Sequence, residues 1–278
     1  MSVETPEKKE SRKLVYCLNR KGIRKRCYVI DKKTSRKSNT MYYVHYENTD
    51  KRMDEWVTSE RLENIPQLAQ SRQSAQKQPK QPKKSEVARN ASESCLVQSH
   101  RHKHARIKNI DKVIFGEDVM EAWYFSPISP QFVGEVNGEK IVYFCDFCLR
   151  FFCCSKELTE HCKRCRVCHP PGNEIYRSEE EKTTINVFEV DGAVEIEYSQ
   201  NICYLSKLFL DHKTLQYDTI PFLFYVLCEV TDIGCRFVGY FSKEKRSDLD
   251  YNLACIMTLP CYQKRGFGNF LISLCFML

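Results

Sequence analysis

The sequence predicts an α+β protein with a small N-terminal β-barrel and a larger mixed domain. Three observations support this class. Short apolar runs separated by polar turns fill residues 12–63, which is typical of small barrels. Residues 64–105 are rich in Lys, Gln and Pro and offer little to bury, which predicts a disordered basic linker. From residue 106 to 278 aromatic and aliphatic side chains become denser, which indicates one folded domain.

The expected strands are short in the front region and longer in the back region. In the front region they lie at residues 14–17, 27–30, 41–46 and 54–57. So many short strands close together favour a barrel over a helical unit. In the larger domain we expect strands at residues 222–227, 237–241 and 253–259 and a helix at residues 265–278.

Basic residues are concentrated at the front of the chain. Residues 1–105 carry 24 Lys or Arg against 12 Asp or Glu, whereas the remainder carries 19 against 24. A basic arm favours an acidic partner, and DNA or RNA is a common one because Lys and Arg displace counterions from phosphates. A solvated basic face gives the same composition, so charge alone leaves both interpretations open.

The chain contains 16 cysteines, and their meaning depends on the redox environment. The first nine residues include four charged side chains and contain no secretory signal. No apolar run reaches the roughly 20 residues needed to cross a bilayer. We therefore expect an intracellular chain with reduced thiols and no membrane association, in which clustered Cys and His bind metal.

A metal-ligand pattern lies near the middle of the chain. Cys145, Cys148, His161 and Cys165 have the spacing C-x2-C-x12-H-x3-C. Because His161 and Cys165 are four residues apart, a helix would place both on one face toward the same ion. Three thiolates and one imidazole complete a tetrahedron, which indicates a structural zinc site. Buried cysteines without a metal are the alternative. The nearby thiols that could compete are Cys153, Cys154, Cys162 and Cys168.

A glycine loop follows the last expected strand. It contains Gly266 and Gly268, and a helix is expected to begin within it. Glycines allow the backbone to approach a phosphate closely, and the free amides of a helix N-terminus favour an anion. Lys264 and Arg265 add positive charge. The loop lacks the patterns of P-loops and of dinucleotide sites, so it favours a pyrophosphate of another kind of cofactor, with an ordinary turn as the alternative.

Six further stretches complete a family pattern: residues 111–116, 122–127, 169–177, 205–215, 238–245 and 254–260. Together with the finger and the glycine loop, they resemble the MYST histone acetyltransferases over nearly all of residues 106–278. The resemblance implies a GNAT-like acetyltransferase domain, incomplete at its C-terminus, with a zinc finger at 143–168 and an acetyl-coenzyme A loop at 255–270. Residues 12–63 resemble the chromo barrel of the MOF-like branch.

The resemblance implies transfer of an acetyl group from acetyl-coenzyme A to a lysine ε-amine, typically on a histone tail. Cys255 matches the family's active-site cysteine, and Lys213 matches the lysine that such enzymes acetylate on themselves. Ile256 and Thr258 match the residues that bond the pantetheine arm. The residues that match the pyrophosphate cradle are Gln263, Lys264, Arg265, Gly266, Phe267, Gly268 and Asn269. The ligands of a structural Zn²⁺ carry over as Cys145, Cys148, His161 and Cys165.

The resemblance also implies partners. A chromo barrel would dock on nucleosomes, histone tails or nucleic acid, with Tyr43, Tyr46 and Trp56 as aromatic candidates for a cage around a methylammonium group. Barrel strands need aromatic residues for their core as well, so both roles are open for these three. A nuclear location and a place in a chromatin complex follow from the same resemblance.

One departure from the family bears on activity. The family's general base is a glutamate beyond the helix that follows the glycine loop, and this sequence ends at Leu278, before that position. An ammonium must lose its proton before it attacks a thioester. We therefore expect a C-terminally truncated acetyltransferase, with an inactive chromatin-binding module as the alternative. A plain zinc-finger binder of nucleic acid would leave the glycine loop unexplained. Smaller departures are Ile220, Cys168 and Cys261.

Overall fold

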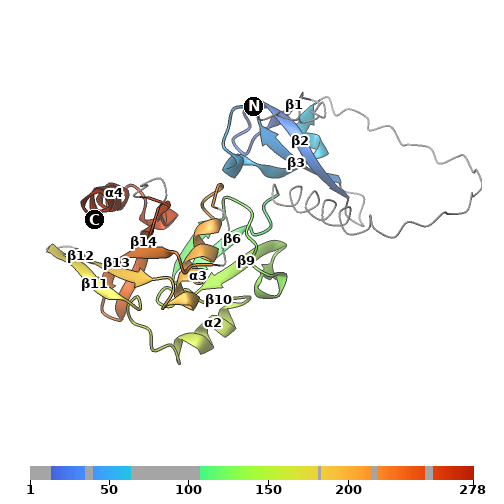
Figure 1. Ribbon diagram of the computed structural model, residues 1–278. Coiled ribbons are helices and arrows are strands. Elements are labelled where there is room, and N and C mark those ends of the chain that lie inside the picture. The colour runs from blue at the N-terminus through green and yellow to red at the C-terminus, as the bar shows by residue number, and fades with distance from the viewer. Residues whose placement is uncertain (1–13, 35–39, 64–106, 181–182, 214–217, 248–252) are drawn as a thin grey trace, which may run out of the picture. The chain divides into compact units, whose positions relative to one another are not determined.

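The computed structural model describes residues 14–34, 40–63, 107–180, 183–213, 218–247 and 253–278 (Figure 1). The chain divides into two compact units, residues 1–104 and 105–278. The expected linker at residues 64–105 lies outside the described residues. Strands dominate both units and helices occur in the second, so the predicted α+β class is confirmed.

The first unit is a five-stranded antiparallel sheet in the order β4-β3-β2-β1-β5. The strands are β1 (Leu14–Leu18), β2 (Arg24–Thr34), β3 (Thr40–Tyr46), β4 (Glu55–Thr58) and β5 (Leu62–Glu63). Short 3₁₀ turns at Lys51–Met53 and Ser59–Arg61 flank β4. The four expected strands are confirmed, whereas the two-residue β5 was too short to predict from its sequence.

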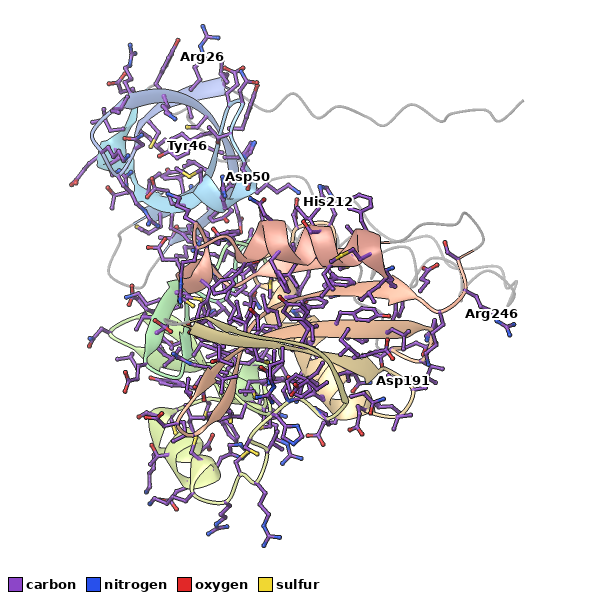
Figure 2. All side chains as sticks on the ribbon, turned by 90° about the vertical axis from the view of Figure 1, so that its left-hand side faces the viewer. Arg26, Tyr46, Asp50, Asp191, His212 and Arg246 are labelled. Atoms are coloured by element: carbon purple, nitrogen blue, oxygen red, sulfur yellow. The ribbon has the colours of Figure 1, made fainter. Side chains whose placement is uncertain are left out.

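A buried carboxylate organises the centre of this unit. Glu55 on β4 accepts a hydrogen bond from the Tyr46 hydroxyl at 2.8 Å and another from the Arg61 guanidinium at 2.8 Å. Tyr46 points into the curled sheet, where its side chain lies among the apolar core residues (Figure 2). Burial opposes the charge on Glu55, but the bonds from Arg61 and Tyr46 outweigh it and lower its pKa. The charge is therefore retained inside the barrel.

The second unit contains a smaller mixed sheet that carries the finger. Its order is β10-β9-β6-β7, with β8 also paired to β9, and β6 runs parallel to β9. The strands are β6 (Lys112–Phe115), β7 (Asp118–Glu121), β8 (Gly134–Val136), β9 (Glu139–Phe144) and β10 (Phe151–Phe152). A 3₁₀ turn at Pro130–Phe132 precedes β8. The helix α2 (Ser155–Cys162) follows β10.

The larger sheet of the second unit is antiparallel throughout, in the order β11-β12-β13-β14-β15 (Figure 1). The strands are β11 (Asn173–Glu180), β12 (Thr183–Asp191), β13 (Phe222–Thr231), β14 (Gly234–Glu244) and β15 (Cys255–Thr258). The helix α3 (Ile196–Lys207) packs against β12, and α4 (Phe267–Met277) packs against β14 and β15. The three expected strands and the final helix are confirmed.

The central strands are buried on both faces, which explains their composition. β13 and β14 read as nearly continuous apolar runs, as expected of strands covered on two sides. One apolar core joins the two sheets with α3 and α4. Its largest fully buried side chains include Tyr240, Phe115, Phe144 and Phe224. The strands that carry the candidate site therefore rest on a rigid support.

Arg236 on β14 ties the two sheets of the second unit together. Its Nε donates to a carboxylate oxygen of Asp146 at 3.0 Å, and its Nη2 donates to Asp118 at 3.0 Å and to the Phe115 carbonyl at 3.0 Å. The guanidinium fork can satisfy several acceptors at once, which an ammonium on a flexible stem does less well. The amide of Phe237 adds a bond to the Asp146 carbonyl at 3.3 Å.

No helix in the described part of the chain is long and apolar enough to cross a membrane.

Replacing Arg236 tests how much this tie contributes. Arg236→Met leaves two carboxylates and a carbonyl without their donor, so we expect the free energy of unfolding of the second unit to fall by about 1.5–3 kcal/mol. Urea denaturation followed by Trp123 fluorescence, in a Trp56→Phe background, measures it. The control is Arg177→Met, which removes an exposed ion pair with Glu174 and should cost less than about 1 kcal/mol. Equal losses in the two variants would contradict the assignment.

Candidate functional site

The metal ligands come from a turn, a helix and the segment after that helix. Cys145 directly follows β9, and its amide bonds the Arg150 carbonyl at 2.9 Å, which closes a tight turn around Cys148. Leu149 adopts a left-handed φ of 61°, which returns the chain toward β10. His161 lies in the last turn of α2. The strand ends therefore fix the first two ligands, and the helix fixes the third.

The expected helical placement of Cys165 is wrong in one respect. α2 ends at Cys162, so Cys165 lies beyond the helix rather than on its face. A further turn brings it back, because the amides of Arg164 and Cys165 both bond the His161 carbonyl, at 2.9 and 2.8 Å. A single hydrogen-bonded turn after the end of α2 therefore places Cys165 near His161, four residues before it.

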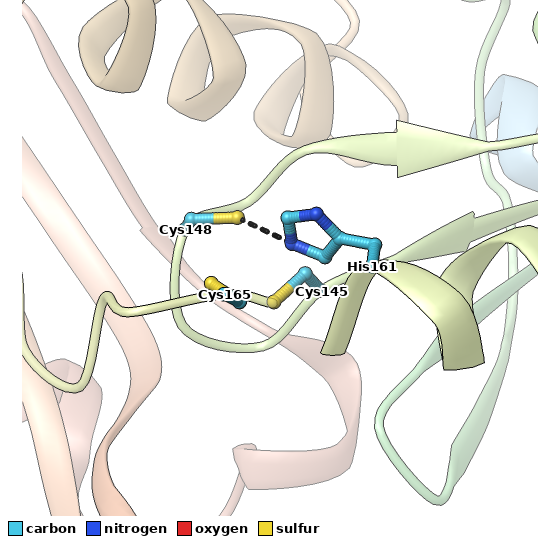
Figure 3. Close-up of side chains that lie close together, drawn as sticks. All are labelled: Cys145, Cys148, His161 and Cys165. Carbon is cyan, nitrogen blue, oxygen red and sulfur yellow. Dashed lines mark hydrogen bonds between the residues drawn. The ribbon is translucent and has the colours of Figure 1, made fainter. Parts of the chain in front are cut away.

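The four predicted ligands converge on one point, as Figure 3 shows. Their ligand atoms all lie within 4.8 Å of one another, and Cys148 Sγ is 3.1 Å from His161 Nε2. A zinc ion binds sulfur at about 2.3 Å, so two sulfurs on one tetrahedral zinc lie about 3.8 Å apart. The cluster matches this size and offers no position to a substrate, so these residues form a structural zinc site.

The Cys145 and Cys148 thiols lie close enough to couple their ionisation. The pKa of Cys145 is lowered and that of Cys148 is raised, because one sulfur retains a proton beside the other. Zinc binds thiolates and displaces such protons. Among the competing thiols, Cys153 and Cys154 belong to a separate cluster with Glu157, so they do not replace any of the four ligands.

The residues expected at the pantetheine lie on a strand edge that, among the described residues, pairs with no further strand. β15 is the last strand in the order of the larger sheet and pairs with β14 on one side. The Leu259 amide bonds the Val238 carbonyl, and antiparallel pairing alternates along a strand. The amides of Ile256 and Thr258 therefore face away from β14, where an extended ligand could bond them.

The glycine loop connects this strand edge to the N-terminus of α4. A 3₁₀ turn at Pro260–Tyr262 follows β15, and α4 begins at Phe267 directly after Gly266. Gly266 has a left-handed φ of 92°, and Lys264 has a φ of 64°. The first turn of α4 carries no acidic side chain and no side-chain cap. Its amides are therefore available to an anion.

Charge in the loop is distributed less simply than its sequence suggests. The Arg265 guanidinium pairs with Glu229 on β13 at 2.6 Å and also lies 5.2 Å from the Tyr262 ring centre. Part of its charge is thus neutralised by the protein itself. Lys264 and Asn269 are exposed, and the Gln263 side-chain amide donates to the Thr258 carbonyl at 3.3 Å.

Cys255 and Lys213 meet in a cavity at the start of β15. The cavity has a volume of about 290 Å³. The Lys213 ammonium donates to the Cys255 sulfur at 3.7 Å and lies 5.8 Å from the Tyr240 ring centre. Burial raises the pKa of the Tyr240 hydroxyl to about 12 and also raises that of the Cys203 thiol. The two residues that the family resemblance selected are thus adjacent, although 42 positions separate them in sequence.

Sequence reasoning missed most of the cavity wall. The other lining residues are Cys203, Asp218, Thr219, Phe222, Phe224, Ser242, Glu244, Leu253 and Ala254. They come from α3, β13, β14 and connecting segments, so no local spacing joins them. Strand alternation is a local signal, since Phe222 and Phe224 on β13, like Ser242 and Glu244 on β14, stand two residues apart and share a face.

The aromatic candidates of the first unit separate into two groups. Tyr43 and Trp56 lie together, with ring centres 5.3 Å apart, and the Lys33 ammonium lies 4.2 Å from the Trp56 ring centre. Tyr46 lies within the apolar core cluster and donates its hydroxyl to Glu55, so its ring belongs to the core, whereas Tyr43, equally buried at 2% exposed, lies outside that cluster. The cage remains a prediction, and Tyr43 with Trp56 are the residues left to form it.

Three family profiles match this sequence. The profile described as "MYST family zinc finger domain" matches residues 107–165, and the profile described as "MOZ/SAS family" matches residues 169–278. The profile described as "RNA binding activity-knot of a chromodomain" matches residues 10–64. The zinc-finger match contains the four zinc ligands. The MOZ/SAS match contains the larger sheet and the residues that line the cavity. The third match covers the barrel of the first unit.

Curated relatives include several proteins named as histone acetyltransferases. "Histone acetyltransferase of the MYST family 1" of Arabidopsis thaliana is 41% identical over 247 residues, which are 85% of this chain and 54% of that protein. "Histone acetyltransferase ESA1" of Kluyveromyces lactis is 37% identical over 286 residues, covering 88% and 63%. "Histone acetyltransferase mst1" of Schizosaccharomyces pombe is 47% identical over 195 residues, covering 70% and 40%. The chain spans about half the length of these relatives.

Removing one ligand tests the zinc assignment. The unaltered chain should keep its zinc ion during dialysis against a mild chelator. We expect His161→Ala to lose that ion and to be cleaved by proteases between residues 145 and 168. The reason is that zinc contributes roughly 10–16 kcal/mol to the folding of small zinc domains. Metal analysis and limited proteolysis measure both effects. The control is Cys162→Ser, beside His161 but outside the four ligands. An unchanged zinc content in His161→Ala would refute the assignment.

Proposed function

We propose that this chain, which belongs to the MYST family of histone acetyltransferases, binds acetyl-coenzyme A and transfers its acetyl group to a lysine ε-amine of a histone. The reaction converts a thioester and an amine into an amide and a free coenzyme A thiol. The proposal rests on three features that occur together around one strand. They are the open edge of β15, the uncapped N-terminus of α4 that follows it, and the cavity that holds Cys255 at its start.

The open edge and the helix N-terminus would bind different parts of the cofactor. A pantetheine arm is an extended chain with amide groups, and the outward amides of Ile256 and Thr258 match such a chain as an added strand would. The diphosphate would lie against the amides that begin α4, within the loop Gln263, Lys264, Arg265, Gly266, Phe267, Gly268 and Asn269. This arrangement directs the thioester toward Cys255, at the other end of the same strand.

The cavity would hold the reacting groups. Cys255 supplies a sulfur nucleophile at the end of the open edge, and Lys213 supplies an amine at 3.7 Å from that sulfur. We propose that Lys213 is an acetyl acceptor within the chain itself. A cationic amine cannot attack a thioester, so its proton must leave first. The carboxylates of Asp218 and Glu244 line the same cavity and add negative charge to it.

We propose separate roles for the other parts of the chain. The domain boundaries we propose are 12–63 for the barrel, 64–105 for the linker and 106–278 for the acetyltransferase domain. The barrel would dock on the nucleosome, a histone tail or RNA, with Tyr43 and Trp56 near the contact. The relatives' names point to histone substrates, from which we propose a nuclear protein that works within a chromatin complex.

A substitution in the glycine loop tests cofactor binding. Ala at position 266 must adopt a left-handed φ, which costs about 1–2 kcal/mol, and any shift of the turn moves the amides that face the diphosphate. We expect Gly266→Ala to weaken acetyl-coenzyme A binding by about tenfold or more in calorimetry. Gly138→Ala is the matched control, because Gly138 has a φ of 82° and, like Gly266, has no neighbouring atom within 4 Å of an added Cβ. It should lose stability without losing affinity. Equal affinity in both variants would contradict the cradle.

A second substitution tests acetyl transfer itself. With radiolabelled acetyl-coenzyme A and histones, we expect transfer by the unaltered chain and a loss of about 100-fold or more in Cys255→Ala, on the scale of positioned catalytic groups. Cys261→Ala removes a neighbouring thiol that does not line the cavity and should keep its activity. Peptide mapping should find acetyl-lysine at position 213. Binding of the cofactor without transfer would favour a chromatin-binding module, and equal activity in both cysteine variants would exclude a role for Cys255.

A further inference from the structure

Two adjacent cysteines form a cluster with a glutamate at the start of α2. Cys153 and Cys154 follow β10, and Cys154 is the residue directly before the helix. Glu157 lies in the first turn of the same helix. The Cys153 thiol donates to a Glu157 carboxylate oxygen at 3.3 Å. The two sulfurs and the carboxylate oxygen all lie within 4.8 Å of one another. Three ligand atoms of metal-binding types thus share one small volume.

The local backbone explains why these three side chains meet. Cys154 is extended, with φ −148° and ψ 159°, so the chain turns sharply from strand into helix at this point. Side chains in a helix tilt toward its N-terminus, which directs Glu157 back over the two cysteines. The pairing of β10 with β9 holds the preceding residues in place. The cluster is therefore fixed by the strand on one side and by the helix on the other.

The cluster is separate from the structural zinc site. Within the part of the chain that the structure describes, the two ligand groups share no residue. Cys154 does not cap α2 through its side chain, so its sulfur is not committed to the helix end. Cys153 and Cys154 are partly exposed and Glu157 is exposed, whereas Cys145 and Cys148 of the zinc site are buried. The second cluster is thus accessible from solvent.

We propose that Cys153, Cys154 and Glu157 form a second, solvent-open site for a thiophilic divalent cation of the zinc class. Two thiolates favour zinc or cadmium over magnesium or calcium, which prefer oxygen. Three protein ligands leave a fourth tetrahedral position, which water fills at an exposed site. Donor atoms on one zinc lie less than about 4 Å apart, so small side-chain rotations would suffice to complete the site.

Electrostatics support a cation at this place. The Glu157 carboxylate raises the pKa of Cys153 chiefly by hydrogen bonding, which stabilises the protonated thiol, with smaller contributions from burial and from repulsion between the two negative charges. A divalent cation between the sulfur and the carboxylate removes that repulsion. Because this site has three ligands and is exposed, it binds more weakly than the closed four-ligand site and exchanges its ion with solvent. The proposal does not depend on acetyl transfer.

Cadmium titration of the full reduced chain tests the proposal. Each Cd–S bond adds absorbance in the ultraviolet, so two filled sites give five such bonds and the structural site alone gives three. We expect two cadmium ions per chain by metal analysis for the unaltered protein. In Cys153→Ser/Cys154→Ser, one ion and about two fifths of the added absorbance should be lost. Glu157→Gln should weaken binding of the second ion and leave the first unchanged.

A second double variant controls for the number of thiols. Cys168→Ser/Cys235→Ser also removes two thiols that are not fully buried and belong to neither cluster, so it should still bind two ions. Two ions in the unaltered chain and in this control, with one ion in Cys153→Ser/Cys154→Ser, support the site. A single ion in the unaltered chain, or two ions in Cys153→Ser/Cys154→Ser, overturns it.

Discussion

The contact between Arg236 and the metal-binding turn is the constraint on which the candidate site depends. Asp146 lies between the ligands Cys145 and Cys148, and it binds β14 twice, through the Arg236 guanidinium and through the Phe237 amide. A zinc ion that fixes the turn therefore fixes the start of β14 as well. Since β14 is the strand to which β15 pairs, a bound metal would stabilise the proposed cofactor-binding edge without contacting the cofactor.

The open edge of β15 could pair with another chain, but it could also bind an extended ligand. An unpaired strand edge exposes amides and carbonyls that invite pairing with another chain. β15 is only four residues long and ends at Pro260, which limits such pairing. We propose that the same exposed groups bind the extended cofactor. Because Cys255 begins this strand and lines the cavity, strand geometry would set the distance between a cofactor bound at the proposed edge and the cavity.

Local sequence patterns predicted the helices and strands. Contacts between residues far apart in sequence determine which side chains meet in the candidate site. The apolar runs of β13 and β14 and the spacing of the zinc ligands are properties of neighbouring residues, so the sequence was sufficient for them. The pairing of Arg265 with Glu229 joins residues 36 positions apart, and Lys213 meets Cys255 across 42. No periodicity encodes such contacts. Arg236 was missed for the same reason, because its three acceptors lie on other strands and turns. The family resemblance supplied Cys255 and Lys213, which residue patterns alone did not.

The glycine loop shows how backbone strain and ligand binding are linked. Lys264 adopts a left-handed φ of 64°, a conformation that costs a residue with a side chain about 1–2 kcal/mol. Gly266 adopts a similar φ without that cost, and α4 starts immediately after it. Successive turns of this kind direct neighbouring amides toward one side, which creates an anion-binding concavity. The free energy of anion binding at these amides would offset part of the conformational cost at Lys264. Lys264 thus places an exposed positive charge in the loop at a backbone position that glycine would occupy at lower cost.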